Sequence, residues 1–231
     1  MASLSGEPAG SPQRWRRHAN RDGSLGGLVR DDAAVHPDAF LGSEAVVYGP
    51  GVRLGAGTRV TGLSTVGGKV ETAGRVEIEE STVFGGLRRT SHLADSTVRH
   101  ARIHASDAIS STIEDGASIV YSKVTDSRVA GRGSEVNASV VDGGAAVLDG
   151  AKVFKSGLKE GAQARGAGVE LLDVFAGNGA VLERPGRIVA QEVNDQRHAF
   201  SAGERRIDGS GMARLDLPLW RPEGLLRQHV Q

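Results

Sequence analysis

A short apolar repeat runs from Ala33 to Leu158 and constrains the fold of this chain more than any other feature. A mostly small residue precedes an apolar residue by two positions, and the pair recurs every five to seven residues. Positions two apart in a strand share a face, so both members of each pair are expected to point inward. A repeat this short, with no helical stripe beside it, predicts short strands separated by sharp bends, as in a β-helix.

The repeat falls into two series, separated by an insertion around residues 87–89. The second series starts at Leu93 and continues to Leu158, and each of its thirteen partner residues is Ser or Ala. Three sides would make one coil of about eighteen residues. The sequence therefore predicts an all-β fold, a single-stranded parallel β-helix of about seven to eight triangular coils. The inward residues expected in the first series are Val35, Leu41, Val47, Leu54, Val60, Val66, Thr72, Ile78 and Phe84.

The hexads resemble the hexapeptide repeat of left-handed β-helix proteins, as in Leu54-Gly55-Ala56-Gly57-Thr58-Arg59 followed by Val60. The resemblance covers about 125 residues and implies left-handed winding. That superfamily is best known for acyltransferases that use acyl-CoA or acyl carrier protein. Many steps after Leu93 are five residues long, which departs from the hexapeptide pattern. Those steps are similar to the looser helices of sugar nucleotidyltransferase C-terminal domains, or to pentapeptide-repeat proteins.

Composition divides the chain into three parts. Residues 1–26 are rich in Gly, Ser, Pro and Arg, and are expected to form a flexible N-terminal tail or a hook for a partner or nucleic acid. Residues 27–182 form the β-helix. Residues 183–231 are expected to form a cap or a partner-binding arm, because the end of a solenoid exposes strand edges. Leu215, Leu217 and Trp220 would supply an apolar lid for that cap.

Charge and cysteine content exclude several functions. The 28 basic and 28 acidic residues balance, so no surface for nucleic acid is predicted. No segment approaches the roughly 18 apolar residues that span a membrane, and residues 1–17 lack the apolar core of a signal peptide, so we expect a cytoplasmic protein. The absence of cysteine excludes disulfides and thiolate metal sites. We predict no metal site, because His100 and His104 would lie on different sides of the prism.

Stacking of the coils brings polar residues of successive repeats into columns. One column contains Glu80, His100 and Asp115, and a second contains Glu71, His92 and Asp107. In a catalytic hypothesis, His100 is a general base that Glu80 or Asp115 orients. In the alternative, each column is a charge ladder that modestly stabilises the packing of neighbouring coils.

One side of the predicted prism carries outward apolar residues. They would form an oligomer interface or a docking strip for the C-terminal segment. The residues of this apolar face are Val46, Tyr48, Val83, Val120, Tyr121 and Phe154.

Two classes of function remain open at this point. The first is a non-catalytic scaffold or interaction protein that needs no cofactor and forms a homo-oligomer, either a trimer or a polymer. The second is a trimeric acyltransferase that transfers an acyl group from acyl-CoA to a small hydroxyl or amine. The insertion at residues 85–90 is too short to cover a substrate, which favours the scaffold, whereas fold analogy alone supports the enzyme.

Overall fold

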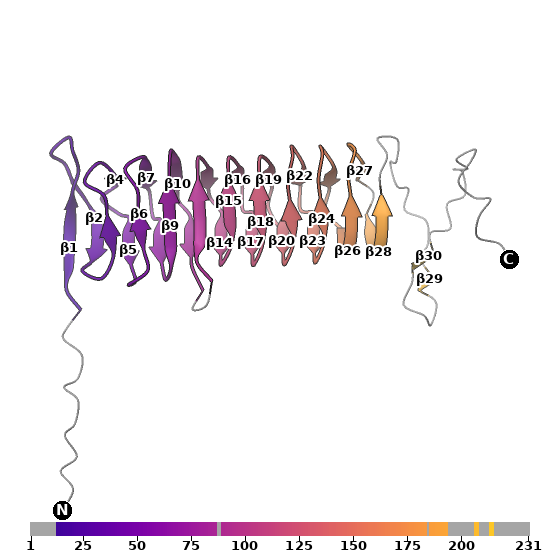
Figure 1. Cartoon of the computed structure of the whole chain (residues 1–231), viewed down its shortest axis with the longest axis horizontal. Coiled ribbons are helices and arrows are strands. Elements are labelled where there is room, and N and C mark those ends of the chain that lie inside the picture. Colours follow the sequence, from indigo (N-terminus) through magenta and orange to yellow (C-terminus); the bar gives the residue numbers. More distant parts are fainter. Residues whose placement is uncertain (1–12, 87–88, 184, 194–205, 208–212, 215–231) are drawn as a thin grey trace, which may run out of the picture.

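The computed structural model of this chain describes residues 13–86, 89–183, 185–193, 206–207 and 213–214, and this part contains strands and no helix. The strands stack into a row of similar coils along one axis (Figure 1). Corresponding residues of successive coils pair in parallel register, as Val83 does with Val66 and Ile103. The predicted parallel β-helix is therefore confirmed.

Each coil has three sides, which we call side 1, side 2 and side 3. Side 1 contains β2 (Leu25–Arg30), β5 (Val46–Tyr48), β8 (Thr65–Gly67), β11 (Thr82–Phe84), β14 (Arg102–His104), β17 (Ser118–Val120), β20 (Glu135–Asn137) and β23 (Lys152–Phe154). Side 2 contains β3 (Ala34–Val35), β6 (Arg53–Leu54), β9 (Val70–Ala73), β12 (Ser91–Ala94), β15 (Asp107–Ile109), β18 (Lys123–Thr125), β21 (Val140–Val141) and β24 (Gly157–Leu158). Side 3 contains β4 (Phe40–Leu41), β7 (Thr58–Thr61), β10 (Val76–Glu79), β13 (Thr97–Arg99), β16 (Thr112–Glu114), β19 (Arg128–Ala130), β22 (Ala146–Leu148), β25 (Gln163–Arg165) and β27 (Val181–Leu182).

The last two strands of the row, β26 (Val169–Ala176) and β28 (Gly186–Val193), each run through sides 1 and 2 without a break. Side 3 has nine strands in the described part, so the solenoid has about nine coils rather than seven to eight. The difference arises because the repeat extends at both ends, through β2 before Ala33 and through β25 to β28 after Leu158.

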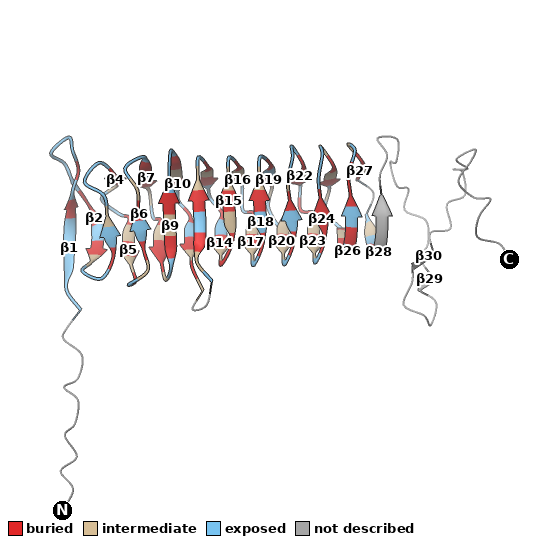
Figure 2. Cartoon of the chain, in the orientation of Figure 1, coloured by how far each residue is buried: buried red, intermediate tan, exposed pale blue. Residues whose placement is uncertain are grey.

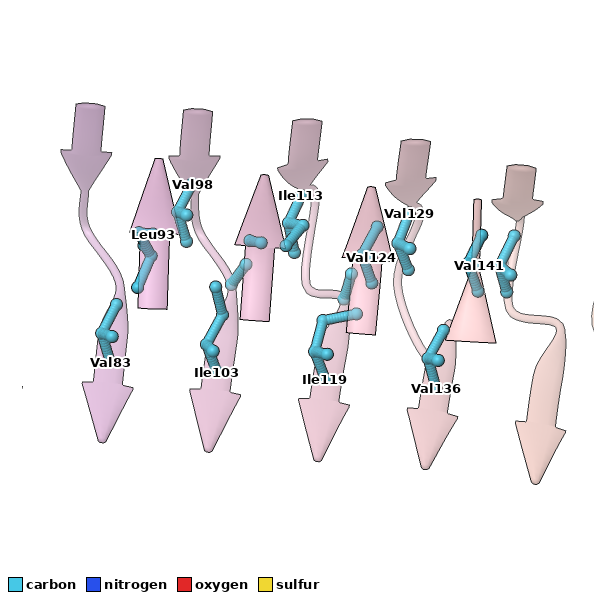
Figure 3. Close-up of a cluster of buried hydrophobic side chains, with 14 of the residues drawn as sticks. Val83, Leu93, Val98, Ile103, Ile113, Ile119, Val124, Val129, Val136 and Val141 are labelled. Atoms are coloured by element: carbon cyan, nitrogen blue, oxygen red, sulfur yellow. The ribbon is translucent and has the colours of Figure 1, made fainter. Parts of the chain in front are cut away.

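The core is a narrow stack of mostly Val, Ile and Leu side chains, with smaller residues such as Ala108 and Ala164 at some strands (Figure 3). Alternation along each short strand places the residue before and the residue after the core position outward. Buried and exposed residues therefore alternate along each strand, and buried residues stack on buried residues of the next coil (Figure 2).

Sharp corners in the second half of the solenoid use residues in the left-handed conformation. Fourteen non-glycine residues of the described part have φ between 44° and 58°, and all of them lie from Glu80 onward. At a five-residue step, one such residue turns the chain and the residue after it is usually a buried serine, as in Tyr121-Ser122 and Asp126-Ser127. In the described part before Glu80, the positive φ angles belong to glycines such as Gly62 and Gly68.

The buried serines form ladders of hydrogen bonds. On side 2, each hydroxyl accepts a hydrogen bond from the backbone N–H of the next serine, at 3.0–3.1 Å. The same hydroxyl donates to a backbone carbonyl near the corner, for example from Ser122 to Val120 O at 2.7 Å. The serine N–H groups find their partners in this way, whereas Val120 O also accepts a hydrogen bond from the backbone N–H of Ala138. The serines of this ladder are Ser91, Ser106, Ser122, Ser139 and Ser156.

The expected inward position of Phe84 is wrong by one residue. Val83 is fully buried and pairs with Val66, whereas Phe84 points outward and is partly exposed. The reason is that Glu80, with a φ of 44°, completes the corner after Ile78 in a single residue, so the step is five residues long and not six. The five-residue steps thus begin before the insertion.

The structure also differs from the expected tail. Within residues 1–26, β1 (Trp15–Ala19) pairs antiparallel with β2, so part of this region is a strand at the end of side 1. At the other end, β28 continues the solenoid beyond residue 182. The described part of the predicted cap also includes β29 (Arg206–Ile207) and β30 (Ala213–Arg214), and Leu215, Leu217 and Trp220 lie outside the described residues.

Candidate functional site

His100 and Glu80 meet at the corner between sides 3 and 1. Both have left-handed backbone, which turns their side chains out of the prism, and His100 Nε2 lies 3.4 Å from Glu80 Oε2. The two side chains are 57% and 55% exposed. Asp115 occupies the same corner one coil further on, but among the described residues the carboxylate that His100 contacts is that of Glu80 and not that of Asp115. The structure therefore joins two members of the predicted column at an open surface position.

The second predicted column lies on side 2. His92 Nδ1 is 3.5 Å from Glu71 Oε2, whereas Asp107 lies opposite His92 in the register and is 3.6 Å from Arg89 Nη2. Arg89 also donates a hydrogen bond to Tyr121 O at 3.2 Å. These contacts hold the end of the 85–90 insertion against the corner between sides 1 and 2.

Side 3 carries a denser network of charges. Arg99 lies 3.0 Å from Glu77 and 3.3 Å from Glu79, and Arg75 lies 3.1 Å from Glu77. Hydrogen bonds from Arg75 and then from Arg99 hold the pKa of Glu77 below its usual value, against the opposing effect of desolvation. A polar hollow beside this network is lined by Arg75, Glu77, Asp95 and Thr97. Opposite charges that pair across neighbouring coils are what the charge-ladder interpretation expects.

Side 1 carries outward apolar residues, most of them in one column that His104 and Asn137 interrupt. We call this set the side-1 strip: Val46, Tyr48, Phe84, Val120 and Phe154, all outward and partly exposed on strands of side 1. Four of these residues and Tyr121, which lies at the adjoining corner and is 52% exposed, belong to the predicted apolar face. Val83 does not belong to it, because this residue is in the core and Phe84 takes its place.

Aromatic rings gather at the N-terminal end of the strip. The ring centroids of Tyr48 and Phe84 are 5.7 Å apart, and that of Trp15 is 6.3 Å from Tyr48. Gly67 lies between the two coils, and a Cβ atom there would come within 2.8 Å of Phe84 and 3.0 Å of Tyr48. The absence of a side chain at Gly67 therefore lets the rings close over the sheet.

The N-terminal end of the solenoid is closed by β1 and by polar side chains that follow it. The side-chain amide of Asn20 donates to Leu41 O and its oxygen accepts from Leu41 N–H, both at 2.9 Å, as a neighbouring strand would. His18 Nε2 donates to Ala39 O at 2.9 Å. Both side chains are buried. The first strands of sides 1 and 3 thus have partners for their outer edges.

A second hollow lies near the C-terminal end of side 1. It is lined mainly by Phe154, Leu172, Lys155, Glu170 and Arg187. Neither this hollow nor the polar hollow on side 3 includes His100. The described residues contain no cluster of three or more His, Cys, Asp or Glu side chains placed to hold a metal ion. They also contain no helix that is long and apolar enough to cross a membrane.

Sequence reasoning missed the closing role of His18 and Asn20 and the hydrogen bonds of the serine ladders. The first has no signal in the repeat, because both residues precede it. The second does have a signal, since serine follows a residue that tolerates left-handed backbone, as in Asp95-Ser96 and Asp126-Ser127.

Comparison with models of known protein families and comparison with the curated proteins each found no match.

Proposed function

We propose that this protein is a non-catalytic β-solenoid scaffold of the hexapeptide-repeat type that associates laterally with copies of itself. The side-1 strip carries this proposal. Its apolar residues share one side and recur at whole coils, so a second flat side could bury them together. The left-handed winding that the hexads imply belongs to the same proposal.

The closed N-terminal end favours side-by-side association over end-to-end growth. A second solenoid that stacked on this end would have to displace β1 from β2 and Asn20 from Leu41. Each displaced backbone group would lose a hydrogen bond before gaining a new one. The sides need no such rearrangement, because their strands are already paired.

The dimensions of side 1 are compatible with a specific interface. Ten strands at about 4.8 Å spacing give a length of roughly 45 Å. A stable interface buries about 800 Å² on each partner, so most of the side would have to take part. An interface of this kind would include the strip from Val46 to Phe154.

Molar mass in solution tests the proposal. We expect light scattering after size-exclusion chromatography to give a mass well above the 24.1 kDa of one chain. Val120→Asp, which places a charge in the middle of the strip, should lower this mass. The matched control is Leu148→Asp, because Leu148 is also an outward, partly buried residue, but on side 3. A wild-type protein that stays monomeric at every concentration would refute the proposal, and so would equal effects of the two substitutions.

The contact between His100 Nε2 and Glu80 Oε2 supports a second candidate, a trimeric acyltransferase that uses acyl-CoA. In that enzyme His100 would take a proton from the acceptor hydroxyl or amine, and Glu80 and Asp115 would orient the ring. Titration with acetyl-CoA, followed by assay of free CoA with small alcohols and amines, tests it. Saturable binding together with turnover that His100→Ala abolishes would establish the enzyme, and lack of binding would eliminate it.

A further inference from the structure

Side 2 carries an apolar patch near the C-terminal end, separate from the side-1 strip. We call this set the side-2 patch: Val140, Gly157 and Phe175, which occupy one column on β21, β24 and β26. Phe175 is 59% exposed and Val140 is 37% exposed. A Cβ atom on Gly157 would lie 3.0 Å from the Phe175 ring, so this ring lies close over the glycine. The result is a flat apolar surface that extends across three neighbouring strands.

The patch is distinct from the rest of its side. From Arg53 to Lys123, the same outward column consists of charged or titratable residues. The apolar character is therefore confined to the last coils. The residues of the charged part are Arg53, Glu71, His92, Asp107 and Lys123.

The chain leaves the solenoid next to this patch. Phe175 pairs with Glu192 and Ala176 with Val193 in the register of β26 and β28, so the end of β28 is one strand away from the exposed ring. Cα atoms of β30 lie within 8 Å of Cα atoms of β28, which shows that the chain returns to this end of the molecule. The sequence directly after β30 is rich in apolar residues, including Leu215, Leu217, Trp220, Leu225 and Leu226.

The size of the patch favours a segment of the same chain over another molecule. Two side chains with a glycine between them cover much less than the roughly 800 Å² per partner that a stable complex buries. A tethered segment does not need that area, because a short flexible connection gives an effective concentration on the order of millimolar. Only a few residues separate Arg214 from Trp220, so the connection is short once β30 is in place.

We propose that the apolar residues of segment 215–230 dock laterally on the side-2 patch, with Phe175 at the centre of the contact. Docking buries the exposed ring and fixes the end of the chain against the last coils. This inference is independent of self-association through the side-1 strip, because it concerns a different side and a contact within one chain.

Tryptophan fluorescence tests the docking in the full chain. The protein has two tryptophans, so Trp15→Phe leaves Trp220 as the only reporter. In this variant we expect short-wavelength emission and weak quenching by acrylamide. Addition of Phe175→Ser should shift the emission to longer wavelength and increase the quenching constant several-fold. Phe175 is largely exposed, so circular dichroism should show an unchanged fold.

The matched control is Leu63→Ser, which removes an even more exposed apolar side chain at the corner between sides 3 and 1 and should leave Trp220 unchanged. The proposal would be overturned if the Trp15→Phe variant alone showed the emission of a water-exposed indole. It would also be overturned if Phe175→Ser did not alter the emission of that variant. A buried signal that disappears on dilution would identify a second copy as the occupant instead. Molar mass, measured in parallel, keeps this result separate from the outcome for the side-1 strip.

Discussion

The coils before Glu80 and the coils after it turn the same kind of corner by different means. The earlier coils mostly take six residues per side and place glycines, such as Gly62 and Gly68, where φ is positive. The later coils often take five residues and place Asp, Ala, Tyr or Lys there, followed by a serine whose hydroxyl bridges two coils. Both kinds of corner lead into the same continuous core.

The comparison shows how a side chain can replace backbone freedom. Left-handed backbone costs about 1–2 kcal/mol at a non-glycine residue. A ladder serine makes two hydrogen bonds, each with a net contribution of about 0.5–1.5 kcal/mol. The two effects are of similar size, so the serine offsets the strain of the shorter corner. The earlier coils need no such compensation.

The largest effect is expected from Gly68→Ala in the earlier coils. The new Cβ would collide with Gly85 O, and φ at this position is +75°. We expect a loss of about 3–5 kcal/mol in the free energy of unfolding, measured by urea denaturation. Gly144→Ala in the later coils is the control, since φ is +79° but no atom lies within 4 Å. It should cost only about 1–2 kcal/mol, and equal losses would contradict a special role for close approach.

A smaller loss is expected from Ser122→Ala in the later coils. This change leaves Ser139 N–H without its serine partner, whereas Val120 O keeps the hydrogen bond from Ala138 N–H. Unsatisfied buried groups cost about 1–3 kcal/mol, so we expect a loss near 2 kcal/mol in urea denaturation. Ser110→Ala makes the same chemical change at an exposed corner and should be nearly neutral. If both variants unfold at the same urea concentration, the ladder contributes nothing.

A slight gain is expected from Ala138→Gly. Ala138 has a φ of 48°, so glycine removes strain there, although it also gives the unfolded chain more freedom. We expect the free energy of unfolding to rise by less than about 1 kcal/mol. Ala117→Gly, at a buried position without positive φ, should instead lower it. A loss at both positions would show that the left-handed corners are not strained.

The smallest effect concerns the junction between the two regions, where Glu77 of β10 pairs with Arg99 of β13. The pKa of Glu77 is lowered in the folded protein, so its ion pairs stabilise the fold above the usual pKa of 4.5. This contribution is lost as the pH falls through the lowered pKa. Wild type should therefore exceed Glu77→Gln in stability at neutral pH, and the difference should disappear in acid. A difference that does not depend on pH would show that charge does not hold the junction.

The architecture was predictable because two-residue alternation and regular stacking leave little choice of face or neighbour. The same rule fails at Phe84, since Ser81 with Val83 and Thr82 with Phe84 both fit a small residue two positions before an apolar one. Only the corner at Glu80 decides between them. Stacking also places Glu80, His100 and Asp115 in one column, whereas the choice of Glu80 as the partner of His100 depends on side-chain torsions that a repeat does not encode.

The serine ladder of side 2 also makes the length of the molecule adjustable. Ser122, Ser139 and Ser156 repeat the same bonds at intervals of 17 residues, so a coil between two of them carries its own connections on both faces. Asn20 and β1 contact only the first coil, so their contacts do not depend on the number of coils that follow. Duplication or deletion of a whole coil in this stretch would therefore yield a longer or shorter rod with the same two ends. In such a rod the number of serines measures distance along the axis.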